Sequence, residues 1–412
     1  MQIWIVNYYT VPPAFARNER HLKFAHYLQE AGYDVTIFCA QCNKAGEQGV
    51  PLKGQLFKET SYGEYKFVHV KVKSYQGNGI ARMVSLFQFA WRILTHRKRF
   101  EKPDVILHNI HEPFDYPISW CAKKLKSKYI VEDWDLWTQS FVDTGLVKKG
   151  SIVSKILYRI NKKLFSKADR IIFTMEGGSD YIRQRGWNRE AGGPIDMSKV
   201  YYINNGLDLA DFKRNTIVHI REDKDLANTS LQKIIYLGSI SLANNIKELI
   251  DAANILKNHQ NIRFLIYGDG ANRSELEKYC KDNHIDNVVF KEKSIPLHDV
   301  SYVISQARVN ILNYYKNFGL YGVSSGKLFQ YLAAGKPICC NINMKKYDLI
   351  SRYNIGISKE FVSAQEYADA ILFLINLSDN EYAAMCKRVS EVARQFDYKV
   401  LSDQLIDILK EL

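Results

Sequence analysis

The segment 321–338, YGVSSGKLFQYLAAGKPI, places a loop of small residues and a positive charge at the start of an expected helix. Exposed N–H groups at a helix N-terminus favour a bound anion, and the helix dipole adds to this. Lys327, in the first turn, would add a point charge suited to phosphate. The loop residues are Gly322, Ser324, Ser325 and Gly326. An ordinary loop with a serine cap has the same pattern, so this segment alone indicates only a candidate anion site.

Ionisable side chains follow an apparent strand at 105–108, in the loop HNIHEPFDYP. They are His108, His111, Glu112 and Asp115. Because ligands of open α/β folds lie at the carboxyl ends of strands, the loop is a candidate site. A hydrogen-bonded structural role is an equally good interpretation of either histidine.

Asp133 and Asp135 form a D-x-D pattern after another apparent strand. Alternate side chains of a strand share one face, so the pair could bind a metal ion. We favour two other interpretations. Asp135 could orient a substrate hydroxyl, or the two residues could cap a helix with buried hydrogen bonds.

Short apolar strands alternating with helices must position these residues, which is typical of parallel, doubly wound sheets. The expected strands are 3–6, 34–39, 67–72, 105–108, 129–131, 170–174, 200–203, 233–237, 264–267, 288–290, 309–312 and 337–340, and the expected helices include 18–30, 246–257, 274–283, 327–334 and 398–412. We therefore predict an α/β protein of two Rossmann-like domains. The N-terminal domain spans 1–207 together with a returning C-terminal helix at 396–412, a linker spans 208–231, and the C-terminal domain spans 232–395. No dinucleotide or P-loop fingerprint is present, which argues against an NAD enzyme or a P-loop ATPase.

Composition narrows the class of protein. The 412 residues are 46% hydrophobic and 25% charged, as in globular proteins. No window approaches the roughly 20 apolar residues of a membrane span, and the first residues lack the basic segment of a secretory signal. The seven cysteines include a single C-x-x-C pair without a second half, so we expect reduced thiols in a cytoplasmic protein.

Positive charge is concentrated in the N-terminal half. Residues 1–200 carry 31 Lys and Arg against 19 Asp and Glu, whereas residues 201–412 carry 26 against 25. Two basic stretches with apolar and aromatic residues, 80–100 and 146–170, account for much of the excess. Basic amphipathic helices can lie in an anionic membrane interface, although core helices with a solvated basic face have a similar pattern.

Four segments together resemble a known family. The segment 321–338 resembles the nucleotide-sugar site of retaining glycosyltransferases of family 4 (group 1), which have the GT-B fold. Three more segments match the family in order: 133–138 (DWDLWT), 200–212 (VYYINNGLDLADF), and 234–242 with 264–270 (FLIYGDG). The similarity is greatest to bacterial enzymes of O-antigen and capsule assembly.

The resemblance implies a mechanism. A nucleotide diphosphate sugar, by default a UDP-sugar, would bind the C-terminal domain, and the acceptor would bind the N-terminal domain across a cleft. The departing phosphate would take the acceptor proton, without a metal or other cofactor. The implied catalytic residues are His111, Asp135 and Lys327, and the acceptor-side residues are Glu112 and Asp133. The implied donor-binding residues are Arg17, Gly238, Ser239, Lys247, Gly268, Asp269, Lys293, Ile295, Gly322, Ser324, Ser325, Gly326 and Gln330.

The chain departs from the family at the donor site. Many relatives carry two glutamates with seven residues between them, where this chain has Gly322 and Gln330. Gln330 can still hydrogen-bond ribose hydroxyls, but without the strength of a charge. The first loop lacks the usual glycines, and Arg17 could substitute through its side chain. These differences leave the donor sugar open.

The family context implies an acceptor carried on a polyprenyl diphosphate and a peripheral location at the inner face of the cell membrane. An epimerase or hydrolase of the same fold is an alternative, as is an inactive binding partner of another transferase. We expect no nucleic-acid partner, because no recognition motif accompanies the basic residues.

Overall fold

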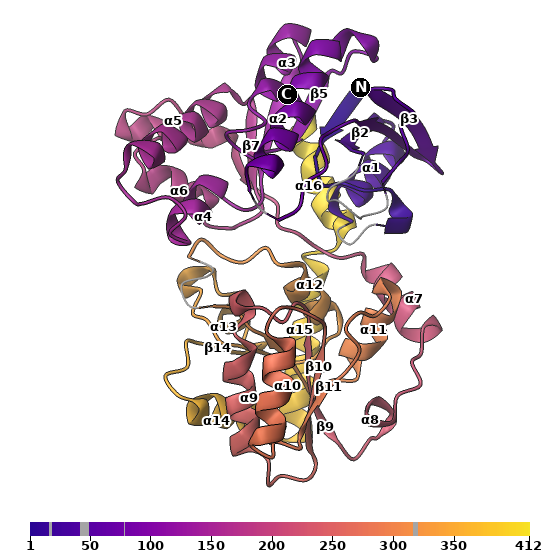
Figure 1. The fold of residues 1–412 in the computed structure, drawn as a ribbon, viewed down its shortest axis with the longest axis vertical. Helices are drawn as coiled ribbons and strands as arrows, with labels where there is room; N and C mark the ends of the chain where they lie inside the picture. Colours follow the sequence, from indigo (N-terminus) through magenta and orange to yellow (C-terminus); the bar gives the residue numbers. More distant parts are fainter. Residues whose placement is uncertain (16–18, 42–48, 78, 316–319) are drawn as a thin grey trace. The chain divides into compact units, whose positions relative to one another are not determined.

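The computed structural model describes residues 1–15, 19–41, 49–77, 79–315 and 320–412. The chain divides into two compact units (Figure 1). Unit 1 consists of Met1–Asn204 and Leu401–Leu412, and unit 2 of Asn205–Val400. Each unit is built on its own mainly parallel sheet.

The sheet of unit 1 has the strand order β3-β4-β2-β1-β5-β6-β7-β8. Its strands are β1 (Gln2–Val6), β2 (Asp34–Ala40), β3 (Phe57–Tyr62), β4 (Tyr65–Val70), β5 (Val105–Asn109), β6 (Lys128–Asp133), β7 (Arg170–Phe173) and β8 (Val200–Tyr202). The helices are α1 (Arg20–Glu30), α2 (Ile80–His96), α3 (Pro117–Leu125), α4 (Trp137–Asp143), α5 (Ile152–Lys167) and α6 (Gly178–Gln184). The final helix, α16 (Tyr398–Lys410), begins in unit 2 and continues into unit 1 from Leu401.

The central strands of unit 1 are buried apolar runs, as expected for parallel strands covered on both faces. Strand β1 pairs with β2 on one side and β5 on the other, so the strand order reverses next to β1. In open α/β sheets, ligands bind beside the carboxyl ends of the strands at such a reversal. The ends of β1, β5 and β6 are therefore where functional side chains of this unit are expected.

Unit 2 has six parallel strands in the order β11-β10-β9-β12-β13-β14. They are β9 (Gln232–Leu237), β10 (Ile262–Tyr267), β11 (Val288–Phe290), β12 (Val309–Leu312), β13 (Ile338–Cys340) and β14 (Gly356–Ser358). The helices are α7 (Leu209–Val218), α8 (Lys224–Ala227), α9 (Ile246–Ile255), α10 (Arg273–Asp282), α11 (Leu297–Ser305), α12 (Gly326–Ala333), α13 (Leu349–Arg352), α14 (Ala364–Ile375) and α15 (Asp379–Arg394). Strand β9 lies between β10 and β12, which marks the strand-order reversal of this sheet.

Alternate residues of the unit 2 strands enter two apolar cores. Ile235 and Leu265 belong to the core that includes α11, α12 and α15, whereas Ile234 and Phe264 belong to the core that includes α9 and α14. This alternation follows from the two-residue period of a strand, and it shows that helices cover both faces. Helices α9 and α10 lie side by side in front of the sheet in Figure 1, where the Tyr279 hydroxyl donates to Asp251 at 2.9 Å.

Two elements differ from the sequence prediction. The segment 208–231, predicted as a linker, contains α7 and α8 and belongs to unit 2. Its charged composition is explained by helix capping, because Asp208 and Asp223 accept backbone N–H groups at the starts of α7 and α8. The sequence also gave no sign of β3, an antiparallel edge strand whose polar sequence FKETSY lacks a buried run.

Candidate functional site

Lys327 is the second residue of α12, directly after the loop of small residues. The preceding residue at the helix boundary, Ser325, has extended backbone angles and makes no capping hydrogen bond with its side chain. The first N–H groups of α12 are therefore not capped by that hydroxyl, and they remain suited to an anion. Ser324 lies just before them, and its carbonyl accepts from the Asn205 side chain at 2.7 Å.

Polar and aromatic groups surround the Lys327 ammonium. Its Nζ donates to Asn244 Oδ1 at 2.9 Å and to the Tyr236 hydroxyl at 3.4 Å, and it lies 5.6 Å from the centroid of the Tyr314 ring. Burial lowers the pKa of Lys327 to about 8. Within the part of the chain that the structure describes, no carboxylate forms an ion pair with Lys327, so its charge is available to an anionic ligand.

Close backbone packing at the ends of β9 and β10 requires glycine. A Cβ on Gly238 would lie 3.1 Å from Lys327 Nζ, and a Cβ on Gly268 would lie 1.9 Å from the Gly238 carbonyl oxygen. Both glycines also have positive φ, +153° and +130°. The structure therefore brings together three of the predicted donor-site residues, Lys327, Gly238 and Gly268.

The other predicted donor-site residues have varied surroundings. Asp269 and Lys293 form an exposed ion pair of 3.9 Å at the ends of β10 and β11, and Ile295 packs against the α11–α12 core. The Ser239 carbonyl accepts from the Tyr236 hydroxyl at 2.7 Å. Gly322 has a φ of +96°, Gly326 begins α12, and Gln330 is partly exposed on it. Arg17 lies outside the described residues.

Lys247 pairs within its own helix. Its Nζ pairs with Asp251, one turn along α9, at 2.8 Å and lies 4.5 Å from the centroid of the Tyr279 ring. Lys327 is the lysine that lies next to Gly238. The role predicted for Lys247 stays a prediction.

In unit 1, an Asp–His pair lies after β5. His111 Nδ1 lies 3.3 Å from Asp115 Oδ2, and the same carboxylate oxygen faces His108 Nε2 at 3.1 Å. Burial would raise the pKa of Asp115, but the contacts with His108 and His111 outweigh burial and lower it. An ionised Asp115 fixes the orientation of the His111 ring through Nδ1.

Aromatic rings and an arginine surround His111. The rings of Tyr9 and Trp137 pack edge-on against it at 5.0 and 5.1 Å. Arg82 Nε donates to the Tyr9 hydroxyl at 2.7 Å, and its guanidinium lies 4.8 Å from the Trp137 ring centroid. Stacking surfaces and hydrogen-bonding groups together are suited to the faces and hydroxyls of a sugar.

Glu112 and Asp133 form a buried pair of carboxyl groups. Glu112 Oε1 accepts from Asn161 Nδ2 at 3.0 Å, and Asp133 Oδ1 accepts from the Leu136 backbone N–H at 2.9 Å. Burial, then the neighbouring charges of Asp133 and Asp115, raise the pKa of Glu112 well above its usual range. Burial also raises the pKa of Asp133 to about 7. Both shifts favour the protonated forms of the pair.

The D-x-D residues do not share one face. Strand β6 ends at Asp133, and Leu136 has a left-handed φ of +45°, so the chain turns immediately. Asp133 is fully buried and caps this turn, while Asp135 is exposed. The capping interpretation therefore fits Asp133.

Sequence reasoning missed a buried ion-pair cluster. Glu132 is fully buried and accepts from Arg20 Nε at 2.8 Å, and it also lies 2.7 Å from His21 Nε2. Burial would raise the Glu132 pKa, but Arg20 and His21 outweigh it and lower it to about 2. Trp134 Nε1 donates to the same carboxylate at 2.7 Å. The available signal was an acidic residue directly after the apolar run YIV of strand β6.

Comparisons with known proteins cover both units. A family model described as "Glycosyl transferases group 1" matches residues 220–396, and one described as "Glycosyltransferase Family 4" matches residues 19–211. The chain belongs to the family 4 (group 1) glycosyltransferases. A curated relative, the probable glycosyltransferase WbjE of Pseudomonas aeruginosa, is 22% identical over 66% of this chain. The match covers 65% of that relative.

Solved structures share the fold. A trehalose-6-phosphate structure from E. coli bound with UDP-2-fluoro glucose aligns with a TM-score of 0.73 at 11% identity, over 100% of this chain and 99% of that one. Anabaena Alr3699/HepE in complex with UDP and glucose aligns with a TM-score of 0.66 at 13% identity, over 100% of both chains. The prediction of a GT-B fold with two Rossmann-like units is confirmed.

Proposed function

We propose that this glycosyltransferase moves a sugar from a UDP-sugar to a lipid-linked saccharide, with retention of anomeric configuration, in bacterial surface polysaccharide synthesis. The alignment with structures bound to UDP and to UDP-2-fluoro glucose supports the donor. The similarity to WbjE supports glycosyl transfer.

One observation carries the donor proposal: Lys327 is half-buried at the start of α12, without an ion-pair partner among the described residues. The pKa of Lys327 lies below its usual value because burial disfavours the charged ammonium in the absence of a ligand. A diphosphate would provide the missing negative charge. As the sugar–phosphate bond breaks, negative charge grows on the leaving group, and a fixed ammonium stabilises that transition state.

The proposed reaction needs no protein nucleophile. The bond from the anomeric carbon to the diphosphate breaks, and the acceptor oxygen bonds to that carbon from the same face. The hydroxyl proton passes to an oxygen of the departing diphosphate. In this proposal His111 and Asp135 orient the reacting hydroxyls, and no step requires a metal.

A peripheral membrane location is part of the proposal. The exposed apolar residues of α2 recur at helical spacing and form one stripe: Ile80, Met83, Val84, Phe87 and Trp91. Basic residues 97–99 follow directly after this helix. None of the described helices is long and apolar enough to cross a bilayer. An apolar stripe next to basic residues is suited to an anionic membrane surface.

The experiment measures transfer and binding with the full chain. UDP-sugars are screened first by thermal shift, and each ligand that stabilises the chain is then supplied with a lipid-linked acceptor extract. We expect radiolabel to enter the lipid fraction and UDP to be released. Label released only as free sugar would indicate a hydrolase, and a UDP-sugar that binds without any turnover would indicate an inactive relative.

A further inference from the structure

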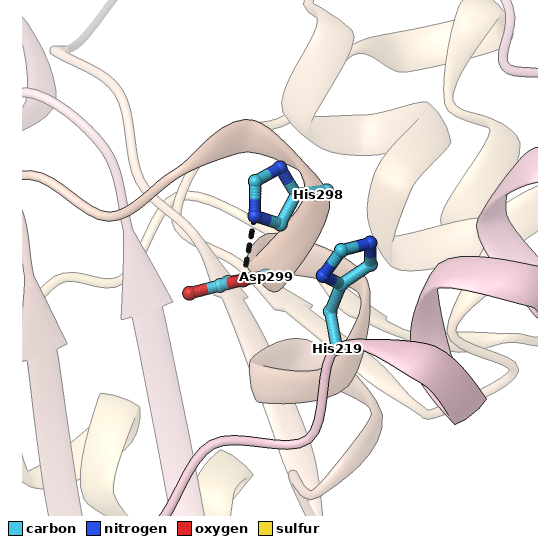
Figure 2. Close-up of side chains that lie close together, drawn as sticks. All are labelled: His219, His298 and Asp299. Atoms are coloured by element: carbon cyan, nitrogen blue, oxygen red, sulfur yellow. Dashed lines mark ion pairs between the residues drawn. The ribbon is translucent and has the colours of Figure 1, made fainter.

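Two histidines and an aspartate converge in unit 2 away from the donor-site residues described above. His219 follows the C-terminal end of α7, and His298 and Asp299 lie in the first turn of α11. One ligand atom from each side chain lies within 4.8 Å of the other two. Figure 2 shows the two imidazole rings beside the Asp299 carboxylate.

The distances suit a transition-metal ion. His298 Nε2 and Asp299 Oδ1 are 3.2 Å apart. Two ligand atoms that each lie about 2.1 Å from a zinc ion are separated by about 3.4 Å at a tetrahedral angle. His298 and Asp299 therefore already have nearly the required separation. The centroids of the His219 and His298 rings are 4.0 Å apart, and the ligand atoms of all three side chains lie within 4.8 Å of one another.

Arg221 fixes the orientation of the carboxylate. The Arg221 Nη1 donates to Asp299 Oδ2 at 2.5 Å, and its Nη2 forms an ion pair with Glu292. This contact occupies Oδ2 and leaves Oδ1 directed toward His298. Hydrogen bonds from residues that do not themselves bind the metal commonly orient the carboxylate ligands of metal sites.

We propose that His219, His298 and Asp299 bind a divalent transition-metal ion of the zinc type, with water at the remaining positions. Imidazole and carboxylate are ligands that zinc, nickel and copper accept, whereas magnesium prefers oxygen alone. The ion ties the end of α7 to the start of α11. The site is partly exposed, so a metal can reach it without unfolding of the chain.

This site is separate from the proposed transfer chemistry. None of its three ligands is a predicted donor or acceptor residue. Loss of zinc binding with an intact UDP response overturns only the metal site. Loss of the UDP response with intact zinc binding overturns only the proposed function.

The test uses the full-length chain after EDTA treatment and removal of the chelator. Zn²⁺ is titrated by calorimetry into the wild type and into His219→Ala, His298→Ala and Asp299→Asn, with Mg²⁺ as the comparison ion. His259→Ala is the matched control, because His259 is an exposed histidine of the same unit outside the cluster. Thermal shift with and without Zn²⁺ gives a second readout and shows that each variant folds.

We expect one Zn²⁺ per chain in the wild type and in His259→Ala, and at least a tenfold loss of affinity in each ligand variant. Zn²⁺ should raise the unfolding temperature of the wild type but not that of a His219→Ala/His298→Ala double variant. The proposal is overturned if no binding is seen at a Zn²⁺ concentration on the order of 100 micromolar. It is also overturned by binding that survives in the double variant, or that depends on one of the three residues alone.

Discussion

Replacing Lys327 by methionine should stabilise the free protein and remove its affinity for UDP. One pKa unit corresponds to about 1.4 kcal/mol, so lowering the Lys327 pKa from 10.5 to about 8 costs the folded state about 3 kcal/mol at neutral pH. Methionine removes this cost but gives up the hydrogen bond from the charged ammonium to Asn244, worth about 2 kcal/mol. The net expectation is a gain of about 1 kcal/mol in unfolding free energy at pH 7.

The pH dependence provides the stricter check. Below pH 8 both folded and unfolded wild type carry the charge, so the folded state has the full burial cost. Between about pH 8 and 10.5 the folded state loses its proton first, and the stability of the wild type rises toward that of the variant. The gain should therefore shrink as pH rises above 8. Wild-type affinity for UDP should fall over the same range, because a neutral amine no longer attracts the diphosphate.

Calorimetric unfolding at pH 7 and 9, with UDP titrations, measures both effects. Lys278→Met is the matched control, since Lys278 is an exposed lysine of the same unit, and it should change neither quantity. Transfer by Lys327→Met should fall on the order of 10²–10³-fold. The reasoning is refuted if this variant is less stable than wild type at pH 7, if the gain does not shrink with pH, or if UDP affinity is unchanged.

Three further outcomes follow from the same structure. Gly238→Ala should weaken UDP binding at least tenfold, because its Cβ would press on the Lys327 side chain at 3.1 Å; titration calorimetry measures this, and wild-type affinity would contradict it. Glu132→Gln should destabilise unit 1 by about 3–5 kcal/mol, because Arg20 loses its buried counter-charge; denaturant unfolding tests it, and a change below about 1 kcal/mol would rule out this role. Replacing basic residues 97–99 by glutamine should reduce sedimentation with anionic vesicles at low salt while sparing transfer to a water-soluble acceptor, and equal sedimentation of variant and wild type would argue against this membrane surface.

The strand and helix pattern could be predicted because each parallel strand is a buried apolar run. The runs at β1, β5 and β9 are continuous in sequence, so local composition was enough. Strand β3 escaped detection because an edge strand exposes alternate polar side chains. The helices α7 and α8 were taken for a linker because their capping aspartates and charged faces resemble a solvated connection.

The candidate site was predictable only where its residues are adjacent in sequence. The loop before α12 and Lys327 form one segment, so their association needed no tertiary information. The partner of Glu132 lies 112 residues away, and nothing local marks Arg20 as buried. The pairing of Lys247 with Asp251, four residues along one helix, could be read from the sequence, whereas the contact of Lys327 with Asn244, 83 residues away, could not.

The direction of each pKa shift shows whether the fold stabilises the charged or the neutral form of a buried ionisable group. Glu132 is buried as deeply as any of them, but Arg20 and His21 lower its pKa, so folding itself accounts for its charge. Lys327, Glu112 and Asp133 shift toward their neutral forms, and in each the first cause is burial. An ionisable group buried where its charged form is disfavoured lowers the free energy of unfolding. Stability alone therefore does not explain why that residue is present. For Lys327, a bound diphosphate would provide the missing counter-charge.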